Sequence, residues 1–220
     1  MDCKGARATD PDAPPPDSTV SDSTLPAPHG TAVLDGTISN GEWSSAYIGQ
    51  LTGGGEVLLM QDGTYLYLGM RRREDVIGTV CLDLGDSVAV LHSSAAIGSA
   101  AYRRTQGKWV LSRRFTWELR DSTMSAVAQE EREAYLQREG WVATNASVGA
   151  RTDTEYKIAM PSGRVRLAVV PMSVGAGYEE VAWWPSRLAD GCRSGGLRTG
   201  YLPADLQFAP DAWITVVAGR

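Results

Sequence analysis

The chain has 220 residues, of which 43% are hydrophobic and 21% charged, and a formal net charge of -5 at pH 7. This length suits one domain with a tail, or at most two small domains, and it can bury a core without disulfide staples. No run of about 18 apolar residues occurs, so we expect no transmembrane helix. The N-terminus lacks an apolar signal-peptide core, so we expect either that the protein stays inside the cell or that a leader has been removed.

Charge is unevenly distributed along the chain. Residues 1–36 hold six aspartates against Lys4 and Arg7, so the remainder is about neutral. A neutral body argues against a general nucleic-acid-binding surface.

Residues 1–30 contain six of the eleven prolines, many Ser, Thr and Asp residues, and no aromatic residue. Such a segment cannot bury enough apolar surface to fold alone. We expect an extended Pro-rich N-terminal tail, either a flexible spacer or a strap that lies along a partner. Cys3 suggests a lipid anchor, although Asp2 stands where a lipoprotein signal normally has a small residue. The domain boundaries are therefore 1–30 for the tail and 31–220 for the folded domain.

The folded domain begins with turns and then forms a hairpin. Asn40-Gly41 predicts a turn, and Glu42–Ala46 one helical turn that carries Trp43 inward. Residues 56–71 form two apolar arms around Asp62-Gly63, a pair that supplies the positive φ angles of a tight β-turn. Because both faces of the arms are apolar, the hairpin belongs in the middle of a sheet that is covered on both sides.

Further strands alternate with turn signals over the rest of the chain, as in sandwiches and barrels. The candidate strands are Gly78–Leu84, Ser87–Ser93, Ser99–Arg104, Lys108–Phe115 (extending towards Leu119), Trp141–Ala146, Thr154–Met160, Arg164–Met172, Glu180–Trp184 and Trp213–Ala218. Residues 123–138 predict a helix with few apolar side chains, capped by Ser122 or Thr123.

The predicted fold is all-β: an antiparallel β-sandwich of the jelly-roll or immunoglobulin-like kind, with one inserted surface helix and the extended tail. Residues 185–210 hold four Gly and three Pro and predict a long, ordered loop, a place where sandwiches often carry function.

Tryptophan is the strongest signal for a binding surface. Trp43, Trp109 and Trp213 fit the core by their alternation with polar residues. Trp183 and Trp184 cannot both face the core of a strand, because adjacent side chains point to opposite faces. One of them is expected to face outward beside Arg187 as a ligand or partner contact, or to lie under the 185–210 loop.

Arginines cluster in three places near strand ends. The three clusters are Arg71-Arg72-Arg73, Arg103-Arg104 and Arg113-Arg114. They could form a basic patch that faces acidic headgroups or an acidic partner. The alternative is scattered edge charges that discourage sheet-to-sheet aggregation.

No catalytic or metal-binding pattern occurs, so we expect neither enzyme activity, cofactor nor metal. His29 lies in the tail, and His92 lies in an apolar strand, where a structural role is favoured. Asp83 and Asp86 could bind Ca²⁺, but a solvated turn is favoured. Cys81 and Cys192 either form a disulfide in an oxidising compartment or are two buried thiols.

Four segments in order resemble the family 9 carbohydrate-binding modules and, more loosely, the DOMON group of β-sandwiches. They are Leu34-Asp35-Gly36 with Glu42-Trp43, Asp62-Gly63-Thr64-Tyr65-Leu66-Tyr67, Gly85-Asp86-Ser87-Val88 and Thr154-Glu155-Tyr156-Lys157-Ile158-Ala159-Met160-Pro161. The resemblance spans residues 31–217. It implies a non-catalytic, extracytoplasmic β-sandwich that binds sugars between aromatic side chains, and it assigns no individual binding residue.

Two functional hypotheses follow. The first is a membrane-extrinsic, periplasmic accessory subunit that docks on a larger membrane complex through its tail and loops, with the cytoplasmic face also open. The second is an extracytoplasmic carbohydrate-binding module. The first predicts protein subunits and a membrane surface as partners, and the second a glycan.

Overall fold

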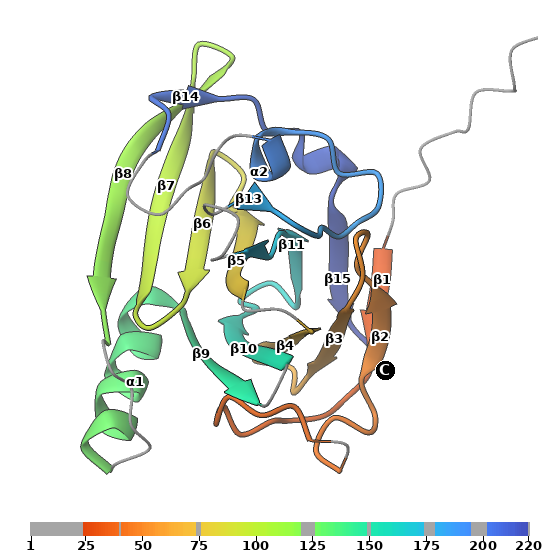
Figure 1. Ribbon diagram of the computed structural model, residues 1–220. Coiled ribbons are helices and arrows are strands. Elements are labelled where there is room, and N and C mark those ends of the chain that lie inside the picture. Colours follow the sequence, from red (N-terminus) through yellow and green to blue (C-terminus); the bar gives the residue numbers. More distant parts are fainter. Residues whose placement is uncertain are drawn as a thin grey trace, which may run out of the picture.

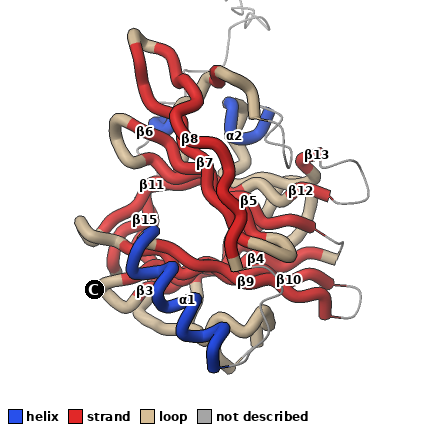
Figure 2. Tube along the Cα trace, turned by 90° about the vertical axis from the view of Figure 1, so that its left-hand side faces the viewer, coloured by secondary structure: helices blue, strands red, loops and turns tan. Residues whose placement is uncertain are grey.

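The computed structural model describes residues 24–39, 41–73, 76–119, 126–148, 151–173, 179–194 and 202–219. Within them, two β-sheets face one another as separate layers (Figure 2). The smaller sheet has the order β2-β3-β4-β10-β9. Its strands are β2 (Tyr47–Gln50), β3 (Glu56–Gln61), β4 (Tyr65–Arg72), β9 (Trp141–Val148) and β10 (Arg151–Ala159).

The larger sheet has the order β1-β15-β11-β5-β6-β7-β8-β14, and β12 pairs with both β5 and β13. Its strands are β1 (Thr24–Ala27), β5 (Val76–Asp83), β6 (Ser87–Ser93), β7 (Ile97–Thr105), β8 (Lys108–Glu118), β11 (Arg164–Val169), β12 (Met172–Ser173), β13 (Glu179–Glu180), β14 (Asp205–Leu206) and β15 (Ile214–Ala218). The helices are α1 (Ala126–Glu139), α2 (Gly191–Ser194) and the short 3-10 helix Pro210–Ala212. The predicted all-β sandwich with one surface helix is therefore confirmed.

The hairpin of β3 and β4 lies in the middle of the smaller sheet, as its two apolar faces predict. Leu66 and Leu68 point into the core between the sheets, whereas Tyr67 packs on the opposite face. Gly63 has a φ of +90° in the turn, a conformation that side chains rarely adopt. The turn forms where Asp62-Gly63 predicts it, but only Gly63 of the pair has a positive φ, and the pairing of Gln61 with Leu66 makes Gly63 and Thr64 its two central residues.

Helix α1 packs along β9, beside the lower end of β8 in Figure 1. Its buried side chains Tyr135 and Leu136 belong to the central core, where Tyr135 meets Trp141 edge-to-face with 5.5 Å between ring centroids. Most of its other described side chains are exposed, in agreement with the predicted surface helix. The predicted cap, Ser122 or Thr123, lies outside the described residues.

Trp183 and Trp184 link the two sheets along one side of the sandwich. Trp183 exchanges backbone hydrogen bonds of 3.0 and 3.1 Å with Thr52, which follows β2, and Trp184 exchanges two of 2.8 Å with Val169 of β11. Because adjacent side chains in extended chain point to opposite sides, Trp184 enters the central core and Trp183 packs on the outer face of the larger sheet.

The described part of the predicted tail is hydrogen-bonded to both sheets. β1 pairs in parallel with β15, and the 28–30 segment then exchanges backbone hydrogen bonds of 2.8 and 2.9 Å with Gln61 of β3. A boundary at residue 31 stays a prediction, and residues 1–23, with Cys3, lie outside the described residues.

Each sheet also carries an apolar cluster on its outer face. On the smaller sheet, Ile38 and Trp43 pack against Leu58, Met60 and Tyr67. On the larger sheet, residues of the 183–213 segment pack over β5, β6 and β7. The larger outer cluster comprises Cys81, Val88, Val90, Ala100, Tyr102, Trp109, Ala168, Val170, Leu188, Cys192, Leu202, Phe208 and Trp213. The sandwich therefore has one central core and two outer ones.

Two strand predictions need correction. The predicted strand 164–172 is broken into β11 and β12, since the N–H of Val170 turns to the carbonyl oxygen of Thr79 and Pro171 has no N–H to donate. The predicted strand 180–184 is reduced to β13 and the two tryptophan bridges. No helix among the described residues is long and apolar enough to cross a membrane.

Candidate functional site

The predicted tryptophan site does not form an open platform. Trp184 is only 7% exposed and lies in the central core, so the structure removes it from the candidate contacts. Trp183 is half-buried, donates from Nε1 to the carbonyl oxygen of Ser186 at 3.2 Å, and has the Arg193 guanidinium 3.4 Å from its ring centroid. One face of Trp183 is therefore occupied by Arg193.

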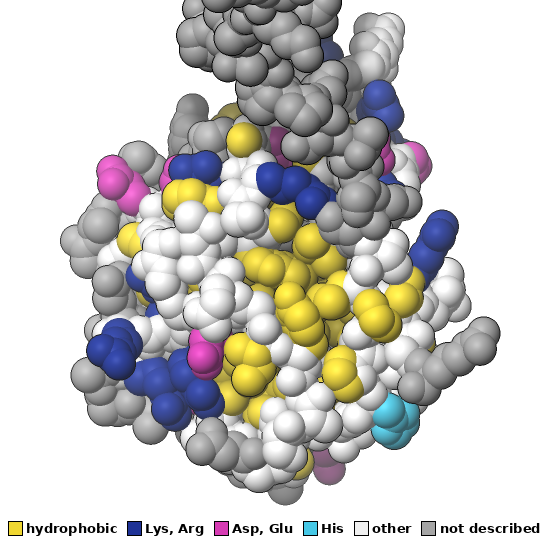
Figure 3. Space-filling view, turned by 90° about the vertical axis from the view of Figure 1, so that its right-hand side faces the viewer, with side chains coloured by type: hydrophobic (Ala, Val, Ile, Leu, Met, Phe, Trp, Pro, Cys, Tyr) yellow, Lys and Arg dark blue, Asp and Glu magenta, His cyan; other side chains and the backbone are white. Residues whose placement is uncertain are grey.

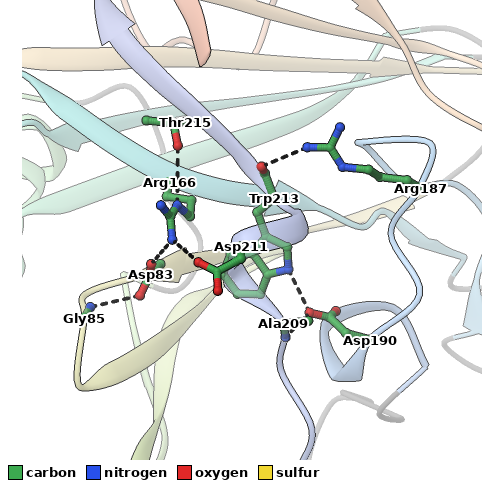
Figure 4. Close-up of polar contacts among 9 residues, drawn as sticks. All are labelled: Asp83, Gly85, Arg166, Arg187, Asp190, Ala209, Asp211, Trp213 and Thr215. Carbon is green, nitrogen blue, oxygen red and sulfur yellow. Dashed lines mark hydrogen bonds and ion pairs between the residues drawn. The ribbon is translucent and has the colours of Figure 1, made fainter. Parts of the chain in front are cut away.

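Arg187 helps to fix the same loop. Its guanidinium donates to the carbonyl oxygens of Ala212 and Trp213 at 2.8 and 3.3 Å, as Figure 4 shows for Trp213. Asp190 accepts from the indole N–H of Trp213 at 2.8 Å and from the backbone N–H of Ala209 at 2.7 Å. These contacts tie the long loop to β15, which gives Arg187 a structural role.

The turn at Asp83 is also occupied by internal contacts. Asp83 forms an ion pair with Arg166 at 3.3 Å and accepts from the backbone N–H of Gly85 at 2.9 Å (Figure 4). Arg166 also pairs with Asp211 at 2.9 Å. Among the described residues, no group of three or more His, Cys, Asp or Glu side chains could hold a metal ion.

A disulfide joins Cys81 of β5 to Cys192 of α2, across 111 positions of sequence. Both cysteines are buried in the outer cluster of the larger sheet. The bond attaches the 183–213 segment to the middle of the sheet.

The three arginine clusters do not form one patch. Arg103 and Arg104 are exposed near the turn of the β7–β8 hairpin, and Arg113 and Arg114 are exposed further along the same hairpin. Arg113 donates to Ser99 at 2.7 Å and pairs with Glu139 of α1 at 3.3 Å. The remaining cluster, Arg71–Arg73, lies on the smaller sheet.

Arg71, Arg72 and Arg73 line a groove of about 610 Å³ together with Arg151, which we call the arginine groove. Its other lining residues are Gln50, Gly53, Gly54, Gly55 and Glu56. The groove lies beside β2, which contributes Gln50 to its lining. Figure 3 shows the face of the molecule that lies on the right in Figure 1, where Lys and Arg side chains gather with an acidic one at the margin of an apolar surface. Sequence reasoning missed Arg151, because only the antiparallel pairing of β10 with β4 brings it next to Arg73.

A polar row crosses the outer face of the larger sheet. Register pairs Thr79 of β5 with His92 of β6, His92 with Gly98 of β7, and Gly98 with Trp117 of β8. His92 is 0% exposed and Thr79 1%. Within the part of the chain that the structure describes, neither ring nitrogen of His92 nor the hydroxyl of Thr79 has a hydrogen-bond partner. Burial lowers the pKa of His92 to about 3, so the imidazole is neutral.

Two half-buried aromatic side chains lie over this row. Phe115 and Trp117, which we call the β8 aromatic pair, stack with 4.9 Å between centroids and 20° between planes. His92 meets Trp117 edge-to-face at 5.0 Å and Phe115 at 5.7 Å. A Cβ at Gly98 would lie 2.9 Å from the Trp117 ring, so glycine allows the indole to pack against β7.

The sequence carried a partial signal for this pair. Phe115 and Trp117 alternate with polar residues, which predicts a half-buried strand, and the structure confirms it. The alternation of polar and apolar residues could not predict that Trp117 lies next to His92. That contact depends on the registers that pair His92 with Gly98 and Gly98 with Trp117.

Glu155 of β10 is a buried carboxyl whose surroundings raise its pKa. It is 0% exposed and accepts from the Gly36 N–H at 2.7 Å and from the Trp43 indole N–H at 3.1 Å. Desolvation raises its pKa to about 7, assisted by the like charges of Asp35 and Glu42. The neighbouring Asp153 is equally buried but pairs with Arg151 at 2.9 Å and Arg71 at 3.6 Å.

No family model matches the chain, and no curated protein does. Among solved structures, the fold is similar to a family 9 carbohydrate-binding module from Caldicellulosiruptor kristjanssonii in complex with cellotriose. The two chains are 10% identical, the alignment covers 90% of this chain and 94% of that one, and the TM-score is 0.48. The resemblance stated from the sequence motifs is to the same family.

Proposed function

We propose that the domain is a non-catalytic, extracytoplasmic module that binds a glycan on the outer face of its larger sheet. The observation that carries this proposal is the β8 aromatic pair, half-exposed over the buried and unpartnered side chains of His92 and Thr79. An aromatic face and hydrogen-bonding groups side by side suit a sugar ring, which has both apolar C–H faces and hydroxyls.

The polar row supplies the complementary chemistry. A neutral imidazole offers one donor and one acceptor, and a threonine hydroxyl offers both. Leaving such groups buried without partners costs roughly 1–3 kcal/mol each. A sugar hydroxyl that reaches past the edge of Trp117 would satisfy them, so binding includes a small displacement of the β8 aromatic pair.

The disulfide supports an extracytoplasmic location. Structural disulfides persist in oxidising compartments and are rare in the cytosol. The Cys81–Cys192 bond fixes the cover of the larger sheet, so it has a structural role in the domain.

The buried acid Glu155 does not argue for catalysis. A carboxyl whose pKa is near neutrality is a frequent sign of an active site. Here both oxygens accept hydrogen bonds from the segment that covers them, and the side chain has no exposed surface. The raised pKa therefore accompanies a structural contact.

The accessory-subunit hypothesis stays a prediction. It docks the domain through its tail and loops. The basic patch that the arginines could form would have to join two sheets, since Arg71–Arg73 lie on the smaller sheet and the other two arginine clusters on the β7–β8 hairpin of the larger sheet. The tail that would act as a strap lies outside the described residues up to residue 23.

A glycan array followed by calorimetry tests the proposal. For the neutral glycan that binds best, Trp117→Ala should weaken binding on the order of tenfold or more, about 1.4 kcal/mol, because the stacking face is lost. Val110→Ala is the control, since Val110 is an exposed apolar residue of the same strand outside the β8 aromatic pair. Circular dichroism should show both variants folded.

The proposal requires that at least one glycan on the array binds and that Trp117→Ala and Val110→Ala differ in their affinity for it. A blank array, or equal affinities for Trp117→Ala and Val110→Ala, would refute a glycan site at the β8 aromatic pair.

A further inference from the structure

The arginine groove is a second site of a different character from the β8 aromatic pair. Four arginines and one glutamate line it, a net charge of +3. Its volume of about 610 Å³ lies within the usual range of small-molecule sites, roughly 300–1,000 Å³. The next two residues after Arg73, Glu74 and Asp75, lie outside the described residues.

Two of the arginines build the walls. Arg72 is only 5% exposed and donates from Nη1 to the carbonyl oxygens of Gly53 and Gly54. Arg71 donates to the carbonyl oxygen of Ile38 at 2.6 Å and pairs with Glu56 at 3.5 Å. The Arg72 hydrogen bonds hold the glycine connection against the end of β4, and the Arg71 contacts fix that side chain between Ile38 and Glu56, so the groove is preformed.

The glycines are needed for this shape. Gly53 and Gly55 have φ values of +92° and +100°, and a Cβ on either would lie within 2.3 and 2.6 Å of a backbone carbonyl oxygen. Gly54 has a φ of +94° but faces open space. The connection can therefore lie close against its neighbours and leave the centre of the groove open.

The other two arginines have donors left for a ligand. Arg73 is exposed and forms no ion pair with any described residue. Arg151 pairs with the buried Asp153 through Nη2 at 2.9 Å, while its Nε is buried without a hydrogen-bond partner among the described residues. A guanidinium fork matches a carboxylate or sulfate in a bidentate geometry.

We propose that the arginine groove binds the carboxylate or sulfate group of an acidic glycan through Arg73 and Arg151. The anion site is independent of the proposed function, whereas the identification of its ligand as a glycan rests on it. A recessed groove suits a discrete anionic group that can enter it. A flat anionic membrane surface would require the arginines to project outward, and it would repel the Glu56 carboxylate in the lining.

Calorimetry with a short oligogalacturonate, its neutral galactose counterpart and inorganic sulfate tests the proposal. The acidic oligosaccharide should bind more tightly than the neutral one, and its affinity should fall as salt is raised from about 0.05 to 0.3 M because the contacts are charged. Sulfate should compete with it.

Variants locate the binding in the groove. Arg73→Ala should weaken binding of the acidic oligosaccharide on the order of fivefold, Arg73→Glu by more than about tenfold, and Arg73→Lys should restore part of it. Arg103→Ala is the matched control, because it removes one exposed arginine far along the other sheet. Arg151→Gln, checked for folding, should resemble Arg73→Ala.

Three outcomes would overturn the proposal. They are equal affinity for the acidic and neutral oligosaccharides, equal behaviour of Arg73→Ala and Arg103→Ala, and binding only to phosphatidylglycerol vesicles. Trp117→Ala separates the two sites, because it should weaken neutral-glycan binding on the order of tenfold or more and leave anion binding unchanged. Absence of glycan binding at the β8 aromatic pair, with an intact anion site, would refute the proposed function and leave an anion site. Glycan binding at the β8 aromatic pair without anion binding in the arginine groove would refute only the groove.

Discussion

The smaller sheet is covered on its outside by described residues of the 32–46 segment, among them Ile38 and Trp43, and the larger sheet by described residues of the 183–213 segment. The first cover is attached by two buried carboxylates of β10: Asp153 accepts from the Ile38 N–H, and Glu155 from Gly36 and Trp43. The second is attached by a disulfide and a large apolar cluster. The covering segment of the smaller sheet is thus attached by hydrogen bonds to buried carboxylates, and that of the larger sheet by a covalent bond and apolar packing.

The difference implies different sensitivities. A buried carboxylate changes its charge with pH, and a disulfide does not. A disulfide responds to reductant, and a hydrogen-bonded carboxylate does not. The two covers should therefore be separable by experiment, from the largest effect to the smallest.

Removal of the disulfide should have the largest effect. The bond closes a loop of 111 positions, and constraint of the unfolded chain predicts a loss of about 4 kcal/mol in the double variant Cys81→Ala/Cys192→Ala. Urea denaturation followed by tryptophan fluorescence measures it. Hydrogen exchange should increase in residues 183–213 and not in 32–46; equal increases in both would contradict the separation.

Acidic pH should instead strengthen the cover of the smaller sheet. Because desolvation raises the pKa of Glu155 from 4.5 to about 7, the folded state holds the proton more tightly than the unfolded state. The contribution of the Glu155 proton to the free energy of unfolding is fully present below pH 4.5 and is lost as pH rises to about 7. The change in the free energy of unfolding is roughly 3 kcal/mol.

Glu155→Gln isolates this effect. The free energy of unfolding of the wild type should fall more steeply between pH 4.5 and 7 than that of the variant, with Glu131→Gln on the exposed side of α1 as the control. Parallel curves for the wild type and Glu155→Gln would show that Glu155 does not titrate in this range.

The polar contacts within the apolar cover should matter less. Asp190 accepts hydrogen bonds from Trp213, Ala209 and Cys192. Asp190→Asn should lower the free energy of unfolding by about 1–2 kcal/mol, because one acceptor oxygen becomes a donor. Asp205→Asn, at an exposed position of β14, should change it by less than about 0.5 kcal/mol. If Asp190→Asn lowered the free energy of unfolding less than Asp205→Asn, the prediction that Asp190 helps to attach the 183–213 segment would be wrong.

The contact of Arg193 with Trp183 should have the smallest effect. Truncation in Arg193→Ala removes a cation–π contact and a 3.2 Å hydrogen bond to Leu188, worth together about 1 kcal/mol. Arg193→Lys should retain part of it. A shift in tryptophan fluorescence without loss of stability would indicate that Trp183 becomes exposed while the cover stays in place.

The sequence predicted the architecture where local signals were strong. Asp62-Gly63 between two apolar arms predicted the central hairpin, and the alternation of apolar with polar residues predicted the half-buried strand β8 of the larger sheet. The geometric argument about Trp183 and Trp184 also held, because adjacent side chains in extended chain diverge whatever surrounds them. It could not say that each tryptophan would pair with a different sheet.

The site depended on contacts between residues far apart in the chain. Arg73 meets Arg151 through the pairing of β4 with β10, and Trp117 meets His92 through two strand registers. Register is a tertiary property, since a shift of one residue moves every side chain to the other face of the sheet. The sequence by itself thus determined an all-β sandwich, its central hairpin and its buried tryptophans, and only the tertiary structure decided which arginines share a groove and which aromatic side chains lie over unpartnered polar groups.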